Sequence, residues 1–347
     1  MTNEAHHHPD ASDPGPGHSS PPQPEPAPPS VHQGAPVAEG QPAEGSGQRS
    51  GIVAVVGRAN VGKSSLVNAL VGEKISIVSP VAQTTWHRIR GIRNDPRGQL
   101  VLVDTPGILK AESELGRWIN RSARRSVEGA DAVMLVLDVA QPPREEDVGW
   151  MERLSRLSAD RPLIFALNKC DLGRTHEADH RQAWDAAIRD RTSPPTPEWI
   201  ACSATTGEGL DVLLDALYAR LPWGPQLFPQ DVLTDFPQKL FIADVVREKL
   251  CLRLKQELPH RVAVEVVKVS DAADGGMDVD ANIWVERSSQ KAIVIGEKGR
   301  MLRAIRRAAE AELTQIYERP VRLHLYVVVK EKWTRNYWQL KALGLDL

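Results

Sequence analysis

The residues Gly57-Arg58-Ala59-Asn60-Val61-Gly62-Lys63-Ser64 form the pattern Gly-x-x-x-x-Gly-Lys-Ser. An apolar run, Ile52–Val56, precedes them and predicts a buried strand, and Ser65–Leu70 predicts the first turns of a helix. A glycine loop between a strand and a helix is the setting of a phosphate-binding Walker A loop. Its backbone N–H groups and the positive end of the helix hold the anion. Lys63 then reaches the outer phosphates, and the Ser64 hydroxyl joins the shell of a Mg²⁺ ion.

The composition predicts a two-domain protein of the cytoplasm. The chain has 347 residues, 41% of them apolar, and a net charge of −2. No run of residues is long and apolar enough to cross a bilayer, and we see no secretory signal. Cys170, Cys202 and Cys251 lie far apart without metal-ligand spacing. We therefore expect neither a disulfide framework nor a zinc site.

Residues 1–50 predict a disordered, proline-rich tail. They contain 11 of the 26 prolines, one basic and six acidic residues, and few large apolar side chains. Such a segment cannot bury enough surface to offset the entropy of ordering. The His6-His7-His8 triplet could bind a metal, but we expect it to be solvated.

From residue 51 to residue 222, strands alternate with helices, which is typical of an α/β domain with a mostly parallel sheet. The turn Asn94–Gly98 joins two apolar runs, so one strand of this sheet should be antiparallel. The predicted strands after the first are 87–93, 99–104, 132–138, 162–168 and 198–203, and the predicted later helices are 115–128, 145–158, 177–189 and 210–220.

Residues 223–237 contain several prolines and predict a linker to a second domain, residues 238–347. That domain should be a separate α+β unit, and residues 226–347 carry a net charge of +3, which favours contact with a polyanion. Its predicted helices are 238–257 and 300–317, its predicted strands are 261–269, 277–286 and 321–329, and the apolar run 291–295 is left unassigned.

Further motifs at successive strand ends predict a guanine nucleotide site. The Asp104 carboxylate can hold Mg²⁺ through a water, and the Gly107 N–H can sense the γ-phosphate. In Asn168-Lys169-Cys170-Asp171, the Asp171 carboxylate can accept from N1–H and the 2-amino group of guanine, which adenine lacks. A backbone N–H of Ser203-Ala204 would close over the base. An ATP-specific P-loop protein is the alternative.

The predicted nucleotide-binding residues are Gly57, Arg58, Asn60, Val61, Gly62, Lys63, Ser64, Ser65, Asp104, Gly107, Asn168, Lys169, Asp171, Ser203 and Ala204. GTP and GDP are the predicted ligands, with Mg²⁺ as the cofactor.

These motifs resemble the TrmE–Era group of GTPases, and within it the Era family. The resemblance covers about residues 51–340 and includes Lys74–Ser79 and Gln83–Gly91. One departure is Trp86, where the family usually has arginine. The resemblance implies a P-loop GTPase domain followed by a type II KH domain.

In that family, the Thr84-Thr85 loop is a switch ordered by the γ-phosphate and Mg²⁺. The resemblance therefore adds Thr84 and Thr85 to Ser64 and Asp104 as metal ligands; the plain alternative is a solvent loop. Ile108 stands where many GTPases place a glutamine that orients water, so we expect slow hydrolysis. Asn60 sits where relatives coordinate K⁺, or it only braces the loop. The predicted catalytic residues are Lys63, Asn60, Thr85 and Gly107.

The stretch Gly296-Glu297-Lys298-Gly299, between an apolar run and a helix, predicts a KH loop that clamps single-stranded RNA. The following helix carries arginines on one side and apolar residues on the other. An ordinary turn with a solvated basic face is the alternative. The predicted RNA-binding residues are Ile295, Gly296, Lys298, Gly299, Arg300, Arg303 and Arg307. Of Ile293 and Ile295, at least one should be core, and Glu297 should point away from phosphate.

The resemblance implies that the RNA is the 3′ end of small-subunit ribosomal RNA and that the task is maturation of the small ribosomal subunit. It also implies peripheral contact with the inner face of the cell membrane, for which no lipid-binding motif is visible. Two alternatives stay open: an RNA-binding assembly scaffold with incidental GTP turnover, and a related GTPase that acts on another RNA.

Overall fold

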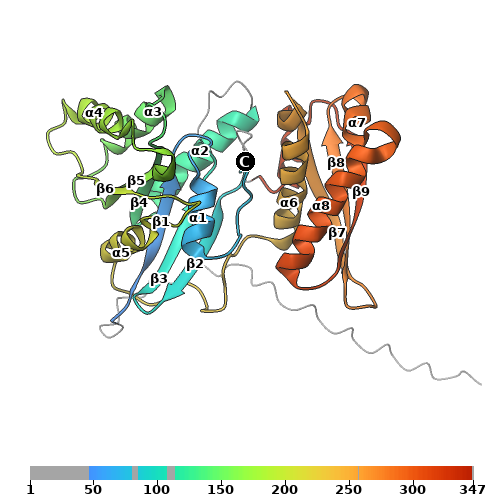
Figure 1. The fold of residues 1–347 in the computed structure, drawn as a ribbon, viewed down its shortest axis with the longest axis horizontal. Helices are drawn as coiled ribbons and strands as arrows, with labels where there is room; N and C mark the ends of the chain where they lie inside the picture. Colours follow the sequence, from blue (N-terminus) through green and yellow to red (C-terminus); the bar gives the residue numbers. More distant parts are fainter. Residues whose placement is uncertain (1–46, 80–84, 108–113, 257, 346–347) are drawn as a thin grey trace, which may run out of the picture. The chain divides into compact units, whose positions relative to one another are not determined.

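Six strands of the described chain form one sheet in the computed structural model, in the order β2-β3-β1-β4-β5-β6 (Figure 1). The structure describes residues 47–79, 85–107, 114–256 and 258–345. Strand β2 is antiparallel to β3 and the other neighbours are parallel, which confirms the predicted α/β sheet with one antiparallel strand. The strands are β1 (Arg49–Val56), β2 (Ile89–Asp95), β3 (Gly98–Asp104), β4 (Ala132–Asp138), β5 (Leu163–Asn168) and β6 (Glu198–Ala201).

Helices cover both faces of this sheet because its strands are apolar on both sides. In β1, Val53 and Val55 are buried against one set of helices, and Ala54 and Val56 are buried against the other. The first set is α1 (Lys63–Val71) and α5 (Leu210–Arg220), and the second set is α2 (Glu114–Glu128), α3 (Glu145–Leu154) and α4 (Glu177–Ile188).

Several strand boundaries differ from the prediction by one to three residues, and contacts distant in the sequence explain two of them. Strand β1 begins at Arg49, inside the expected tail, where the Ser50 N–H donates to the carbonyl of Pro222 at 3.0 Å. Strand β2 begins at Ile89 rather than His87, because the His87 ring is held by the carbonyl of Leu343, 2.9 Å from Nε2. These boundaries depend on partners that are distant in the sequence. Residues 1–46, including His6–His8, lie outside the described chain.

The second domain contains a three-stranded sheet in the order β7-β8-β9, with β7 antiparallel and β9 parallel to β8 (Figure 1). The unassigned run 291–295 is the end of a helix, and a short helix near the end of the chain was not predicted. The elements are α6 (Gln238–Arg253), β7 (Val262–Asp271), β8 (Met277–Val285), α7 (Ser288–Ile295), α8 (Arg300–Tyr317), β9 (Val321–Val329) and α9 (Tyr337–Ala342).

The predicted linker is hydrogen-bonded to the first domain rather than free. The side-chain oxygen of buried Gln99 accepts from the N–H groups of Leu227 and Phe228 at 2.7 and 2.8 Å. The N–H of Ile92 donates to the carbonyl of Leu233 at 2.9 Å. The described residues of both domains belong to one compact unit. No helix among the described residues has the length and apolar character needed to span a bilayer.

Candidate nucleotide and RNA sites

The glycine loop between β1 and α1 borders a cavity of about 360 Å³. A Cβ on Gly62 would lie 2.3 Å from Nδ2 of Asn168, and one on Gly107 would lie 2.7 Å from the Cα of Ala59, so larger residues do not fit there. The cavity is lined by Ala59, Asn60, Gly62, Lys63, Ser64, Ser65, Ile77, Val78, Ser79, Thr85, Gly107 and Lys169.

Lys63 is the buried cation of this cavity. Its Nζ donates to the carbonyl of Arg58 at 2.8 Å, and only 6% of the residue is exposed. Burial lowers the pKa of the Lys63 ammonium to about 8, and the charge of Asp104 opposes this shift only in part. A bound phosphate would restore the charged form of this side chain.

Ser64, Thr85 and Asp104 meet beside Lys63. The Ser64 hydroxyl donates to Oδ2 of Asp104 at 2.6 Å and lies 3.0 Å from the Thr85 hydroxyl. Asp104 is fully buried, burial raises the pKa of its carboxyl, and its Oδ1 has no hydrogen-bond partner in the described chain. Two hydroxyls and a carboxylate with a vacant oxygen are the donors that Mg²⁺ prefers, so these residues fit the ion. Thr84 and Ile108 lie outside the described residues.

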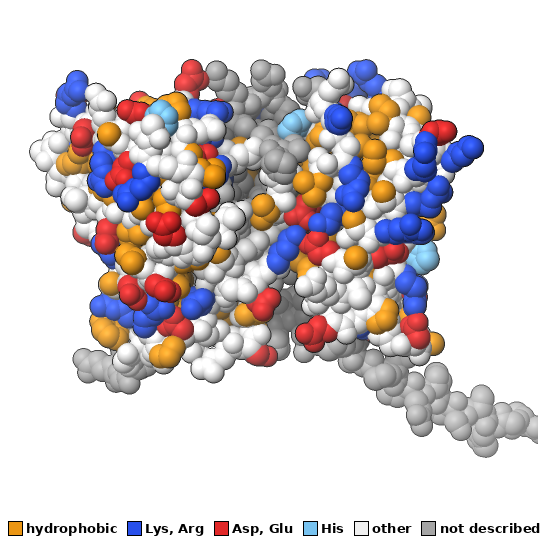
Figure 2. Space-filling model, in the orientation of Figure 1, with side chains coloured by type: hydrophobic (Ala, Val, Ile, Leu, Met, Phe, Trp, Pro, Cys, Tyr) orange, Lys and Arg blue, Asp and Glu red, His pale blue; other side chains and the backbone are white. Residues whose placement is uncertain are grey.

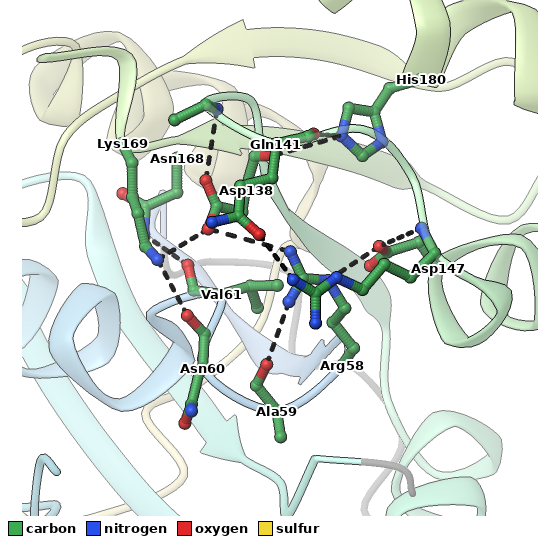
Figure 3. Close-up of polar contacts among 12 residues, drawn as sticks. Arg58, Ala59, Asn60, Val61, Asp138, Gln141, Asp147, Asn168, Lys169 and His180 are labelled. Carbon is green, nitrogen blue, oxygen red and sulfur yellow. Dashed lines mark hydrogen bonds and ion pairs between the residues drawn. The ribbon is translucent and has the colours of Figure 1, made fainter. Parts of the chain in front are cut away.

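Arg58 braces the loop instead of lining the cavity (Figure 3). Its Nε donates to Oδ2 of Asp147 on α3 at 2.8 Å, and its Nη2 lies 3.8 Å from Oδ2 of Asp138 at the end of β4. All three side chains are buried. Sequence reasoning missed Asp138 and Asp147, since nothing near them in the chain marks them as partners of the loop.

The side chain of Asn168, at the end of β5, connects the phosphate loop to the loop after β6. Its Nδ2 donates to the carbonyl of Val61 at 2.8 Å, and its Oδ1 accepts from the N–H of Ala204 at 3.1 Å. Next to it, Nζ of Lys169 donates to the carbonyl of Asn60 at 2.9 Å and to Oδ2 of Asp138 at 2.7 Å (Figure 3). The structure therefore brings these predicted residues together.

The remaining predicted nucleotide residues fall at the strand ends. Asp171 is exposed in the short turn after β5, and no described residue pairs with its carboxylate. Ser203 is buried, and its hydroxyl accepts from the N–H groups of Thr205 and Thr206. Gly57 has a φ of 149°, and a Cβ there would lie 2.5 Å from the carbonyl of Val136. Ser65 lines the cavity.

The predicted KH loop lies between α7 and α8 in an unusual backbone conformation. Gly296, Lys298 and Gly299 have φ values of 70°, 49° and 74°. A Cβ on Gly296 would lie 2.7 Å from the Cβ of Met301, so glycine is required there. The loop therefore exposes backbone next to the first turn of α8.

A basic strip lies on this loop and on α8. Lys298, Arg300, Arg303 and Arg307 are all exposed, and Figure 2 shows basic side chains gathered over α7 and α8. Glu297 forms an ion pair with Arg300, which partly neutralises the start of the strip.

The two isoleucines near the loop differ in their surroundings. Ile295 packs against the core of the second domain, whereas the side chain of Ile293 is 55% exposed. Ile293 is therefore the better placed of the two to meet a base, although the sequence prediction chose Ile295.

Sequence reasoning missed a second set of residues, which tie the nucleotide cavity to the second domain. Oε1 of buried Glu248 on α6 accepts from the N–H of Val78 at 2.8 Å and from Nζ of Lys74 at 3.0 Å. Ile77, beside Val78, is part of the core of the second domain. Because these partners are about 170 residues apart, no local signal could have revealed them.

Trp86 packs at the same boundary between the two domains. It is 4% exposed, its ring centroid lies 5.8 Å from that of Trp333, and the guanidinium of Arg247 lies 4.0 Å above it. Arg247 also pairs with Asp244 at 3.1 Å. Although burial opposes ionisation of Asp244, the charge of Arg247 holds the pKa of this carboxyl below its usual range.

The fold and these sites define a P-loop GTPase joined to a KH domain. A model of the family described as 50S ribosome-binding GTPase matches residues 52–169, and a KH domain model matches residues 257–334. GTPase Era of Synechocystis sp. is 41% identical over 299 residues, which cover 86% of this chain and 93% of the relative. GTPase Era of Geobacter metallireducens is 40% identical, with 85% and 97% covered. The chain belongs to the Era family of GTPases.

Solved structures of Era have the same fold. A variant of Aquifex aeolicus Era bound to GDP and AlF4⁻ superposes with a TM-score of 0.79 at 33% identity, covering 86% of this chain and all of that one. Era in complex with MgGDPNP and nucleotides 1506–1542 of 16S ribosomal RNA gives a TM-score of 0.79 at 34% identity, with the same coverage.

Burial of Lys63 predicts a pH dependence of GTP binding. Below pH 8 the ammonium is already charged, whereas above this pH binding must take up a proton, so affinity should fall by up to about tenfold per pH unit. The dissociation constant would be measured from pH 7.5 to 9. Lys63→Arg keeps its charge over this range and should lack this decline. Identical pH profiles for the two proteins would contradict the prediction that Lys63 binds the phosphates of GTP.

Proposed function

We propose that this GTPase binds ribosomal RNA of the small subunit near its 3′ end and assists assembly of the small ribosomal subunit and maturation of its RNA. The binding and hydrolysis of GTP would set how firmly the RNA is held. The Era complex with nucleotides 1506–1542 of 16S ribosomal RNA supports this choice of RNA, since the two chains share 34% of their residues and this chain covers all of that one.

The nucleotide roles follow from the cavity. Lys63 contacts the outer phosphates, Ser64, Thr84, Thr85 and Asp104 hold Mg²⁺, and the Gly107 N–H senses the γ-phosphate. When bound, Mg²⁺ offsets negative charge on the phosphates. Water attacks the γ-phosphorus in line, the bond from this phosphorus to the β–γ bridging oxygen breaks, and GDP leaves, while the protons of the water pass to the phosphate and the solvent. Lys63 and backbone N–H groups stabilise the charge on the phosphate oxygens. Asp171 recognises guanine, and Ser203-Ala204 closes over it.

One observation carries the link between GTP and RNA: the segment Ile77–Ser79 lines the nucleotide cavity and is held by the RNA-binding domain. Glu248 on α6 accepts the Val78 N–H, and Glu312 on α8, the helix that follows the KH loop, pairs with Lys74 and Lys249. A nucleotide that moves this segment must therefore strain or relieve contacts to α6 and α8. Such a difference between states is what allows one ligand to change the affinity for another.

The RNA assignment can be tested by crosslinking in cells and sequencing the attached RNA, with and without a non-hydrolysable GTP analogue. We expect reads from the 3′ end of small-subunit ribosomal RNA. Lys298→Gln with Arg303→Gln should lose them, and in vitro the slope of log affinity against log salt should fall by about 0.7 for each phosphate contact removed.

The matched control is Arg124→Gln with Arg156→Gln, which removes two exposed charges outside the KH loop. Reads from another RNA would favour the related-GTPase alternative. Normal maturation of small subunits by Lys63→Ala would favour the scaffold with incidental turnover.

The coupling can be tested with Glu248→Gln, which keeps the shape of the side chain and removes its charge. In the wild type, RNA affinity should differ between the GTP analogue and GDP. In Glu248→Gln the ratio of these two affinities should move toward one by about fivefold or more, which is the smallest usual effect of coupling between two sites. Glu310→Gln is the control, because Glu310 lies on α8 and accepts only within the second domain, from the Leu323 N–H. If the two RNA affinities became equal in Glu310→Gln but not in Glu248→Gln, coupling through the contact between Glu248 and Val78 would be refuted.

Two finer features complete the proposal. Asn60, at the edge of the cavity with a φ of 63°, coordinates K⁺ during hydrolysis. We expect turnover roughly tenfold faster in KCl than in NaCl, equivalent to about 1.4 kcal/mol, and loss of this difference in Asn60→Ala. Equal wild-type rates in the two salts would leave Asn60 as a brace of the loop.

We place the protein in the cytoplasm, with peripheral contact to the inner face of the membrane.

A further inference from the structure

A second cavity, of about 590 Å³, lies between α2, strands β2 and β3, and the end of the linker. It shares no lining residue with the nucleotide cavity. Four arginines border it: Arg88 and Arg90 at β2, and Arg121 and Arg125 on α2. The only carboxylate among the described lining residues is Asp235, so the border carries a net charge of +3.

Three of these arginines have no partner among the residues that the structure describes. Asp235 forms an ion pair with Arg90, but no described residue forms a hydrogen bond or an ion pair with Arg88, Arg121 or Arg125. These three guanidinium groups border one hollow surface, and its one carboxylate among the described lining residues, Asp235, is already paired with Arg90.

The spacing of these arginines directs them to one place. Arg121 and Arg125 stand four residues apart on α2, so both lie on the same side of the helix. Arg88 lies immediately before β2 and Arg90 lies within it, and both line the cavity. Like charges at such spacing repel each other and do not help the helix, which suggests that they serve something that binds between them.

The rest of the lining combines apolar side chains with the polar side chains of His87, Ser122 and Ser126. Trp118 on α2 and Phe236 in the linker form part of its wall, together with Ile52, Val103, Pro237 and Leu240. Its volume lies in the usual range of small-molecule sites, which combine apolar walls with a few convergent polar groups. Because the linker and α6 bound it on the side opposite α2, it suits a compact molecule better than a continuous nucleic-acid strand.

We propose that this cavity is a second anion site that takes a compact molecule bearing several phosphates, such as a nucleoside polyphosphate. Arg88, Arg121 and Arg125 bind the phosphates, since guanidinium groups match phosphate oxygens in pairs. The apolar wall around Trp118 accepts a base or sugar. Leu240 and Gly344 of the second domain also line the cavity, so an occupant would favour the docked arrangement of the two domains.

The test uses the full chain saturated with GDP and Mg²⁺, so that the first cavity is filled. Calorimetry with inorganic tripolyphosphate, with inorganic pyrophosphate and with ADP should show binding that weakens as salt increases. Adenine is a poor ligand for the first site, so ADP reports on the second. Tighter binding of ADP than of pyrophosphate would show that the apolar wall holds a base; equal binding would restrict the site to the phosphates.

The decisive variant is Arg121→Gln with Arg125→Gln, at two exposed helix positions. It should bind tripolyphosphate about a hundredfold more weakly, at roughly tenfold for each of the two charged hydrogen bonds lost, while GDP affinity is unchanged. Arg124→Gln with Arg156→Gln removes the same charge elsewhere and should bind like the wild type.

Three results would overturn the proposal. The first is no binding, or equal binding by both double variants. The second is release of GDP as tripolyphosphate is added, which would place the ligand in the first cavity. The third is loss of RNA affinity in Arg121→Gln with Arg125→Gln without any tripolyphosphate binding to the wild type, which would make this surface part of an RNA interface.

Discussion

The side-chain amide of Asn168 is the interaction on which the nucleotide site depends, because it joins loops from three parts of the sheet. It donates to the phosphate loop at Val61 and accepts from the backbone at Ala204. The close approach of Gly62 leaves no room for a side chain beside it. Lys169 and Arg58 extend this bracing to Asp138 and Asp147, so the loop meets a phosphate with its shape already set. Preorganisation of this kind is what makes backbone dipoles effective in stabilising charge.

Two charged groups of this site are buried without full compensation by the described residues. Lys63 is buried where its charged form is disfavoured, and Asp104 is buried with one oxygen unpaired. A nucleotide with Mg²⁺ would satisfy both groups at once, which links occupancy of the cavity to the electrostatics of the loop. The segment Ile77–Ser79 connects this cavity to the second domain, since Ile77 packs in the core of that domain and the Val78 N–H donates to Glu248.

The boundary between the two domains includes specific contacts made by buried residues. The guanidinium of Arg247, on α6 of the second domain, stacks on the indole of Trp86 from the first domain. Glu248, on α6, accepts hydrogen bonds from Lys74 and from the Val78 N–H, both in the segment that follows α1.

The sequence by itself determined the two folds and the chemistry of their loops. The Gly-Lys-Ser loop, the Asp104 and Asn168 motifs and the Gly-x-x-Gly loop are local patterns, and apolar periodicity located the strands and long helices to within a few residues. Only the tertiary structure decided that β1 begins at Arg49, that Arg58 faces Asp147, that Ile295 is core while Ile293 is exposed, and that Glu248 holds the segment near the nucleotide. The physical reason is that these features are contacts between residues far apart in the chain, and local spacing carries no information about which distant partner will satisfy a buried charge or backbone group.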